Sequence, residues 1–221
     1  METNKLNDIK TIYFDYDGTL HDSIKIYAPA FRKAYEYLVS INKAEPKEFT
    51  DNEIAKWLGY TDNEMWDVFM KDLEVQYRKH AEEIIIEEMD VQIHKGNARL
   101  FEDITIVLKE LKKKGYVLVF LSNCGKEYME GADKIFNLNC YFDDMVCSGI
   151  YDNKPKHEIL YEIKNKYPLN QVMIGDRFHD IKTAQYNNIY SIFCEYGYGD
   201  AVEGRDGTVR IKKPIEILNY L

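Results

Sequence analysis

The sequence predicts an α/β protein: a Rossmann-like parallel sheet core with an inserted all-helical cap domain after strand one. Three observations predict this fold class. An apolar run near the start of the chain ends in two aspartates, residues 22–92 contain only helical patterns, and strand and helix patterns then alternate. Alternating strand–helix units indicate a parallel sheet with right-handed crossovers and helices on both faces.

The first strand is expected at Thr11–Phe14, within the run "TIYFDYDGTL". Apolar residues at helical spacing then predict an amphipathic helix from Ser23 to about Ile41, with Ser23 as its N-cap. Two further helices are expected, one preceded by Asp51 and the next by Thr61 or Asp62. Helical character continues to about residue 89, and no part of this segment has the pattern of a strand.

After Gly96 the pattern changes to that of an α/β core. A helix with the apolar positions 104, 107, 108 and 111 ends in three lysines and Gly115, as helix C-termini commonly do. The continuous apolar run "YVLVFLSN" is typical of a strand buried on both faces. Later strands are predicted in "DMVCSG", "QVMIGD" and "YSIFCEYG", with helices near 157–166 and 180–186. We therefore expect a core formed by 1–21 and 93–221, and a helical cap domain formed by 22–92.

Composition limits the classes of function. The chain has 29 Lys and Arg against 38 Asp and Glu, and its net charge of −9 argues against a nucleic-acid partner. Its four cysteines have no C-x-x-C spacing and no secretory leader precedes them, which favours reduced thiols in a cytoplasmic protein. No apolar run approaches the roughly 20 residues of a membrane span, so no membrane partner is expected.

Polar residues collect where the predicted strands end. In an open α/β sheet, ligands bind outside the carboxyl ends of the strands. The residues at these ends are Asp15 and Asp17, Ser122 and Asn123, Lys154, and Asp176 and Asp180. Asp15 and Asp17 are two residues apart, so their side chains are expected to share a face and to repel one another. A cation or a chemical task is the usual compensation for such repulsion.

These residue types suit the chemistry of a phosphate ester. Carboxylate oxygens are the ligands that Mg²⁺ prefers, together with water and substrate phosphate. Lysine and serine side chains stabilise the phosphoryl oxygens during transfer. Two carboxylates in different environments can act as nucleophile and as acid.

The four segments "DYDGT", "SN", "KP" and "GDRFHD", in this order, resemble the four motifs of the haloacid dehalogenase-like superfamily. The helical insertion after the first motif resembles the cap of that superfamily, in its phosphoglycolate phosphatase and β-phosphoglucomutase-like group. The resemblance covers nearly the whole chain. An ordered set of four motifs is far more specific than any one of them.

The resemblance implies a role for each matching residue. Asp15 would be the nucleophile that forms an aspartyl-phosphate, and Asp17 would protonate the leaving alcohol and then deprotonate water. Ser122, Asn123 and Lys154 would bind the phosphoryl group, and Lys154 would also hold Asp15 in place. The Mg²⁺ ligands would be Asp15, Asp176, Asp180 and the backbone carbonyl of Asp17, although Asp180 could instead support the site or cap a helix.

Two residues close to these motifs are further candidates for the site, Lys156 and His21. Lys156 lies close to Lys154, but Pro155 between them favours Lys154. His21 follows the first motif and could reach substrate or act as a hinge residue. Asp17 separates phosphoryl transfer from dehalogenation, because an alkoxide needs a proton to leave and a halide does not.

We therefore expect a Mg²⁺-dependent phosphatase that acts on a small phosphorylated metabolite, as a monomer or weak homodimer. The first alternative is a phosphomutase resembling β-phosphoglucomutase, in which phosphorylated Asp15 persists long enough to transfer its group to a sugar. The second is a binding or regulatory protein that keeps the pocket without turnover. The identity of the phosphate ester does not follow from the sequence.

Overall fold

The computed structural model describes Leu6 and residues 8–221, and the chain divides into two compact units. One unit is Asp22–Arg99, and the other contains the chain up to His21 together with Leu100–Leu221. The expected second boundary, between residues 92 and 93, falls inside a helix that ends at His94. Polar residues such as Asp90 and Gln92 weaken the apolar pattern of its last turns, so the end of this helix was placed too early.

The helical unit contains α1 (Ile24–Ser40), α2 (Asp51–Ala55), α3 (Asp62–Phe69) and α4 (Val75–His94). The core unit contains β1 (Thr11–Phe14), α5 (Ile104–Lys113), β2 (Val117–Ser122), α6 (Lys126–Phe136), β3 (Asp144–Cys147), α7 (Lys156–Ile163), β4 (Gln171–Gly175), α8 (Phe178–Asn187), β5 (Tyr190–Cys194) and β6 (Val209–Ile211). Short 3₁₀ helices cover Leu138–Cys140, Ser148–Ile150, Lys164–Lys166 and Pro214–Asn219.

The core unit is built on one six-stranded sheet in the order β3-β2-β1-β4-β5-β6. All neighbouring strands pair in parallel, as the alternating pattern predicted. β1 lies between β2 and β4, and the chain crosses from one side of β1 to the other after β3. Such a reversal of strand order opens a crevice at the carboxyl ends of the strands. Asp15 and Asp176 directly follow β1 and β4, which flank this reversal.

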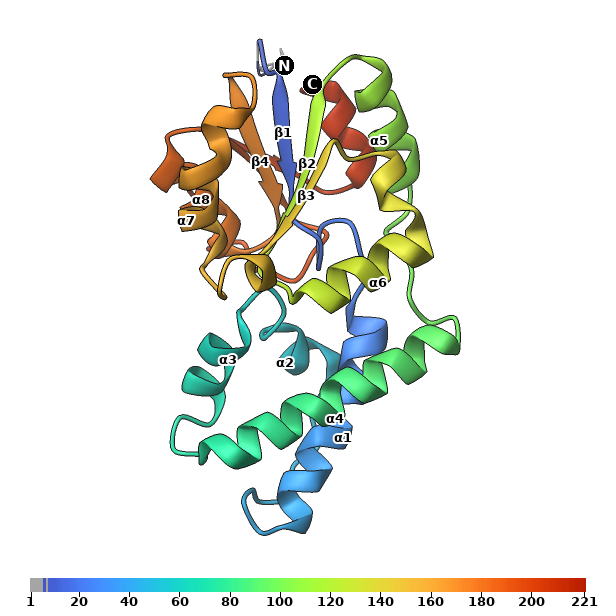
Figure 1. Cartoon of the computed structure of the whole chain (residues 1–221), viewed down its shortest axis with the longest axis vertical. Coiled ribbons are helices and arrows are strands. Elements are labelled where there is room, and N and C mark those ends of the chain that lie inside the picture. Colours follow the sequence, from blue (N-terminus) through green and yellow to red (C-terminus); the bar gives the residue numbers. More distant parts are fainter. Residues whose placement is uncertain (1–5, 7) are drawn as a thin grey trace. The chain divides into compact units, whose positions relative to one another are not determined.

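The sheet is buried on both faces (Figure 1). Phe14, Phe120 and Ile174 pack with apolar residues of α5 and α6 on one face. Their strand neighbours Tyr13 and Met173 pack with α7 and α8 on the other face. Because successive strand residues point to opposite faces, continuous apolar strands are needed here, and "YVLVFLSN" is such a strand.

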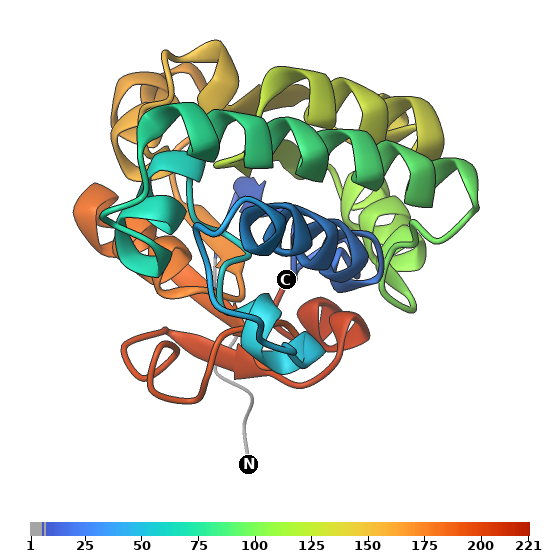
Figure 2. The ribbon, with the colours of Figure 1, turned by 90° about the horizontal axis from the view of Figure 1, so that it is seen from below.

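The helical unit has its own apolar core, in which α1 packs along α4 (Figure 2). α2 and α3 both begin with a capping box, made by Thr50 with Glu53 and by Thr61 with Glu64. The prediction that Ser23 caps α1 was wrong in one respect. Ser23 occupies the N-cap position, but its hydroxyl makes no capping bond and has no hydrogen-bond partner among the described residues.

Two core elements had not been predicted, α6 and the short edge strand β6. β6 has only three residues and follows a loop, so its sequence carries little periodic signal. No helix in the described part of the chain has both the length and the apolar character that crossing a bilayer requires.

Candidate active site

Asp15 lies immediately after β1 and is buried, with 1% of its surface exposed. The backbone N–H of Asp15 donates to the carbonyl of Ile174 in β4, which continues the sheet pairing past the end of β1. Its Oδ1 atom is 2.7 Å from the ammonium nitrogen of Lys156. Its Oδ2 atom is also buried but has no hydrogen-bond partner among the described residues. One oxygen of Asp15 is therefore held, and the other is left for a ligand or for chemistry.

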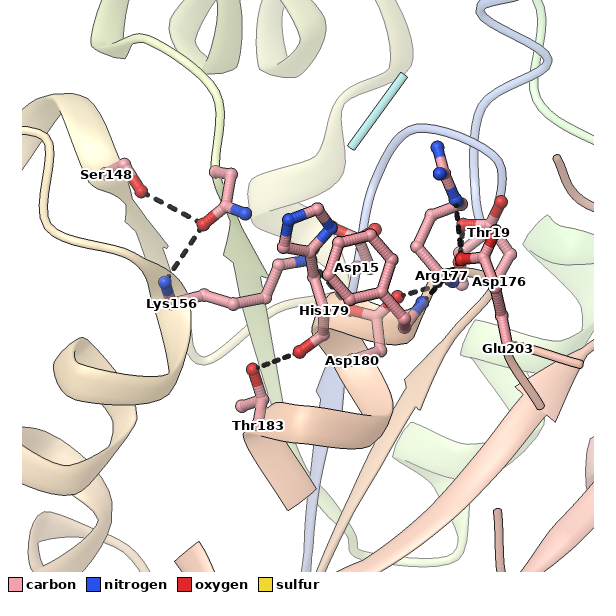
Figure 3. Close-up of polar contacts among 12 residues, drawn as sticks. Asp15, Thr19, Ser148, Lys156, Asp176, Arg177, His179, Asp180, Thr183 and Glu203 are labelled. Carbon is pink, nitrogen blue, oxygen red and sulfur yellow. Dashed lines mark hydrogen bonds and ion pairs between the residues drawn. The ribbon is translucent and has the colours of Figure 1, made fainter. Parts of the chain in front are cut away.

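Lys156 is the first residue of α7 and is fully buried between two carboxylates (Figure 3). Its Nζ atom lies 2.7 Å from Asp15 Oδ1 and 2.7 Å from Asp180 Oδ1. Burial opposes the charge of this ammonium group, but Asp15 and Asp180 more than offset burial, and the pKa of Lys156 is raised. A lysine has three N–H donors, so two bonds leave one for a further acceptor.

The structure corrects the choice between the two lysines. Lys154 does not hold Asp15: its Nζ atom is 2.6 Å from Glu162, and both side chains are more than 40% exposed. The main chain explains the difference. Ser148 Oγ donates to the carbonyl of Lys154, and the N–H of Lys156 donates to Asn123 Oδ1. These bonds fix the loop so that the first residue of α7, rather than the residue before Pro155, reaches the buried carboxylates.

Ser122 ends β2 and is buried, as expected for a group at the carboxyl edge of the strand beside β1. Asn123 follows it, and its side-chain oxygen accepts the N–H of Lys156 at 2.9 Å. Asn123 thus positions the start of α7, in addition to the phosphate contact expected of it. Phosphate binding by Ser122 and Asn123 stays a prediction.

Asp180 lies in the first turn of α8 and contributes both oxygens to the core of the site. Oδ1 accepts from Lys156, and Oδ2 accepts the backbone N–H of Arg177 at 2.9 Å, at the N-terminus of α8. The sequence left open whether Asp180 caps a helix or belongs to the site; the side chain caps α8 and also contacts Lys156, and its role as a metal ligand stays a prediction. It therefore links the position of α8 to that of Lys156.

Asp176 is fully buried and is held from two segments distant in sequence. Its Oδ1 accepts the hydroxyl of Thr19 at 3.2 Å, and its Oδ2 accepts the N–H of Tyr198 at 2.7 Å. Tyr196, in the same loop after β5, donates its hydroxyl to the carbonyl of Thr19 at 2.9 Å. This loop, "EYGYGD", had not been predicted to contact the site.

Asp15, Asp176 and Asp180 form a group suited to a hard cation. One oxygen from each lies within 4.8 Å of the others. Burial, followed by the charge of Asp180, raises the pKa of Asp15 to about 7. Burial and the charges of Asp15 and Asp180 raise the pKa of Asp176 well above its usual value. Lys156 contributes only one positive charge, and the buried Oδ2 of Asp15 has no partner in the described chain, so an oxygen-binding divalent cation such as Mg²⁺ fits this donor set.

Asp17 is not a member of this group of three, and its side chain is 14% exposed. Its Oδ1 accepts the hydroxyl of Tyr128 at 2.9 Å and lies 3.4 Å from His21 Nδ1. The charge of Asp17 is the smallest of the five influences on the pKa of Asp15, behind that of Asp180. The expected repulsion between Asp15 and Asp17 is therefore present but minor, and the carboxylate that dominates comes from α8.

Gly18 provides a test of how closely the first motif packs on Asp176. Its φ is +79°, and a Cβ atom there would lie 2.2 Å from Asp176 Oδ2. We expect Gly18→Ala to displace Asp176 and to lower turnover at least tenfold, because small displacements of catalytic groups are costly.

Gly115→Ala is the matched control, since Gly115 has φ +85° and no atom within 4 Å of such a Cβ. That control should lose about 1 kcal/mol of unfolding free energy and keep its activity. Steady-state kinetics and thermal unfolding measure both effects, and equal activity losses would contradict the packing argument.

Known proteins resemble this chain in sequence and in fold. A family model described as haloacid dehalogenase-like hydrolase matches residues 12–194. A phosphoglycolate phosphatase of Vibrio cholerae is 24% identical over 199 residues, covering 87% of each chain. A pyrophosphatase PpaX of Bacillus cereus is 25% identical over 188 residues, covering 80% of this chain and 79% of that protein. The solved structure of a haloacid dehalogenase-like family hydrolase from Streptococcus pneumoniae superposes with a TM-score of 0.77 at 22% identity, covering 96% of this chain and 98% of that one.

Proposed function

We propose that this chain, which belongs to the haloacid dehalogenase-like hydrolase family, is a Mg²⁺-dependent phosphatase that hydrolyses a small phosphorylated metabolite through a phosphorylated aspartate. The observation that carries the proposal is how the two carboxylate oxygens of Asp15 are placed. This buried carboxylate has one oxygen held by a buried lysine and the other without a partner in the described chain. A nucleophile needs such a fixed position and such a free oxygen.

In the first half of the proposed reaction, a carboxylate oxygen of Asp15 attacks phosphorus and the bond to the ester oxygen breaks. Asp17 gives its proton to that oxygen, and the alcohol leaves. Lys156 keeps Asp15 oriented, and its remaining N–H is available to a phosphoryl oxygen. Ser122 and Asn123 are proposed to bind the same phosphoryl group from the end of β2.

In the second half, Asp17 removes a proton from water, which attacks the phosphoryl group on Asp15 and releases phosphate. The same carboxyl group thus serves as acid and then as base. Asp15, Asp176, Asp180 and the backbone carbonyl of Asp17 would hold the metal. When bound, Mg²⁺ would neutralise negative charge that builds up on the phosphoryl oxygens.

The relatives suggest where to look for the substrate. The names of two of them specify phosphoglycolate phosphatase and pyrophosphatase. We therefore propose phosphoglycolate and pyrophosphate as the first compounds to test, within a broad panel of phosphorylated metabolites. Release of inorganic phosphate is the readout.

Removal of the metal should abolish this activity. We expect EDTA to reduce phosphate release by at least a hundredfold, and added Mg²⁺ to restore it, because the buried carboxylates then lack a balancing charge. Asp176→Asn should need more Mg²⁺ for half-maximal activity than the unchanged protein. Full activity in EDTA would contradict the proposed role of the metal.

The same panel separates the alternatives. A phosphomutase would need a sugar bisphosphate for sustained turnover and would return the phosphoryl group to a sugar instead of water. A protein that only binds phosphate compounds would release no phosphate from any member of the panel at saturating Mg²⁺. Either result would overturn the phosphatase proposal.

A further inference from the structure

Beside the aspartate cluster lies a second group of polar side chains, formed by buried His21 and the half-buried Asp17 and Tyr128. Tyr128 comes from α6 and donates its hydroxyl to Asp17 Oδ1 at 2.9 Å. The same hydroxyl oxygen is 3.2 Å from His21 Nδ1, which is itself 3.4 Å from Asp17 Oδ1. The Tyr128 hydroxyl and the His21 ring therefore both contact the same oxygen of Asp17, Oδ1.

The surroundings hold this group rigidly. His21 is 1% exposed and stacks on the ring of Tyr16, with ring centres 4.9 Å apart. The N–H groups of Thr19, Leu20 and His21 all donate to the carbonyl of Tyr16, and the N–H of Gly18 donates to the carbonyl of His21. The backbone of the turn that carries Asp17 is thus hydrogen-bonded within itself, and this places His21 next to the carboxylate.

The hydrogen of each group can be assigned from the contacts. The Nε2 atom of His21 is buried and has no hydrogen-bond partner among the described residues. A buried N–H without a partner is costly, so the ring hydrogen is best placed on Nδ1, which faces Tyr128 and Asp17. Asp17 Oδ1 then accepts from both neighbours, while Oδ2 has no hydrogen bond within the described residues.

We propose that Tyr128 and His21 are positioning residues that hold Oδ1 of Asp17, so that Oδ2 faces the substrate and carries the proton that passes to the leaving alcohol. Because Oδ1 accepts hydrogen bonds, protonation of Oδ1 is disfavoured, and the proton of the carboxyl group is expected on Oδ2. As the bond between Asp15 and phosphorus forms and the phosphorus–ester bond breaks, this proton moves from Oδ2 to the departing oxygen. This inference rests on the proposed phosphatase function.

The test compares two aryl phosphates whose leaving groups depend to different degrees on protonation by an acid. 4-Nitrophenyl phosphate releases a stable phenolate, whereas phenyl phosphate gains more from protonation of its leaving group. We expect Tyr128→Phe to lower kcat/KM about tenfold for phenyl phosphate and less than about twofold for 4-nitrophenyl phosphate. Tyr13→Phe is the control, because Tyr13 is a buried tyrosine whose hydroxyl has no partner among the described residues. It should leave both rates unchanged.

Two further measurements separate positioning from general damage. In an Asp17→Asn background, Tyr128→Phe should cause no additional loss, because it acts only through Asp17. His21→Asn keeps an N–H near the position of Nδ1 and should retain more activity on phenyl phosphate than His21→Leu. This pair still tests the idea if Tyr128→Phe unfolds, which thermal unfolding would reveal.

Each result has a definite reading. Equal losses on both substrates, or none, in Tyr128→Phe and in His21→Leu would overturn the positioning role while leaving the phosphatase proposal intact. If Asp17→Asn itself has no greater effect on phenyl phosphate than on 4-nitrophenyl phosphate, the acid role of Asp17 fails and this inference fails with it. No hydrolysis of any substrate by the unchanged protein would overturn both.

Discussion

Lys156→Met is expected to lower kcat by at least a hundredfold and to destabilise the fold. The replacement keeps the length of the buried stem but removes the ammonium group that, among the described residues, contacts both Asp15 and Asp180. Breaking a buried ion pair by removing one partner leaves the other charges uncompensated, which costs about 3 kcal/mol or more. Loss of one group that stabilises transferring charge typically lowers kcat by about 10²–10³.

The loss of stability should depend on pH with a defined sign. Asp15 has a folded pKa of about 7, above its unfolded value, so the folded state binds a proton more tightly and loses stability as pH rises toward 7. Lys156 lowers the pKa of Asp15, so without Lys156 the decline in stability should extend to higher pH. Urea unfolding at pH 5 and pH 8, in EDTA, should therefore show a larger deficit for the variant at pH 8.

Lys154→Met is the matched control for this experiment. Its ammonium group forms an exposed ion pair with Glu162, and exposed pairs contribute little to stability. Activity and unfolding midpoint should both stay near those of the unchanged protein. If Lys154→Met were inactive and Lys156→Met active, the placement of these two side chains would be wrong.

The features that the sequence predicted well follow from sheet topology. Parallel strands bring their carboxyl ends to one edge, so residues that directly follow strands meet there even when they are distant along the chain. Asp15 and Asp176 meet for this reason, since β1 and β4 are neighbours. Asp180 joins them because α8 begins shortly after β4 and Asp180 lies in the first turn of that helix.

The lysine was misassigned because its choice depends on a loop. Two lysines flank Pro155, and the residue pattern alone does not tell which one points inward. Asn123, which follows β2, accepts the N–H of Lys156 at the start of α7. This bond determines which of the two lysines reaches Asp15. No periodicity or local propensity encodes that contact.

The partners of Asp17 and Asp176 were missed for a related reason. Tyr128 lies on a helix that was not predicted, and Tyr198 contacts Asp176 through its main chain, for which the side-chain type gives no signal. The repeated Tyr-Gly pairs after β5 are the one available hint. A Cβ atom at Gly197 would lie 2.3 Å from Cβ of Asp176, so glycine is required where this loop passes the site.

Asp15→Asn is expected to abolish hydrolysis completely while making the metal-free protein more stable at neutral and alkaline pH. The amide cannot form the phosphorylated aspartate, so no turnover should remain above background. The amide oxygen can still accept a bond from Lys156, and the repulsion between Asp15 and Asp180 disappears. Activity and stability should therefore move in opposite directions, as is common where a site is built for chemistry.

The pH dependence distinguishes this explanation from a simple packing effect. The unfolded carboxyl group titrates near pH 4 and the folded group near 7, so wild-type stability falls between these values as Asp15 loses its proton in a buried site. Asparagine does not titrate, and the variant should not show that part of the decline. In EDTA, the difference in unfolding free energy between Asp15→Asn and wild type should grow by more than about 1 kcal/mol from pH 4 to pH 8. A difference that is constant with pH would mean that Asp15 is not the buried, charge-strained group from which the proposed nucleophile is built.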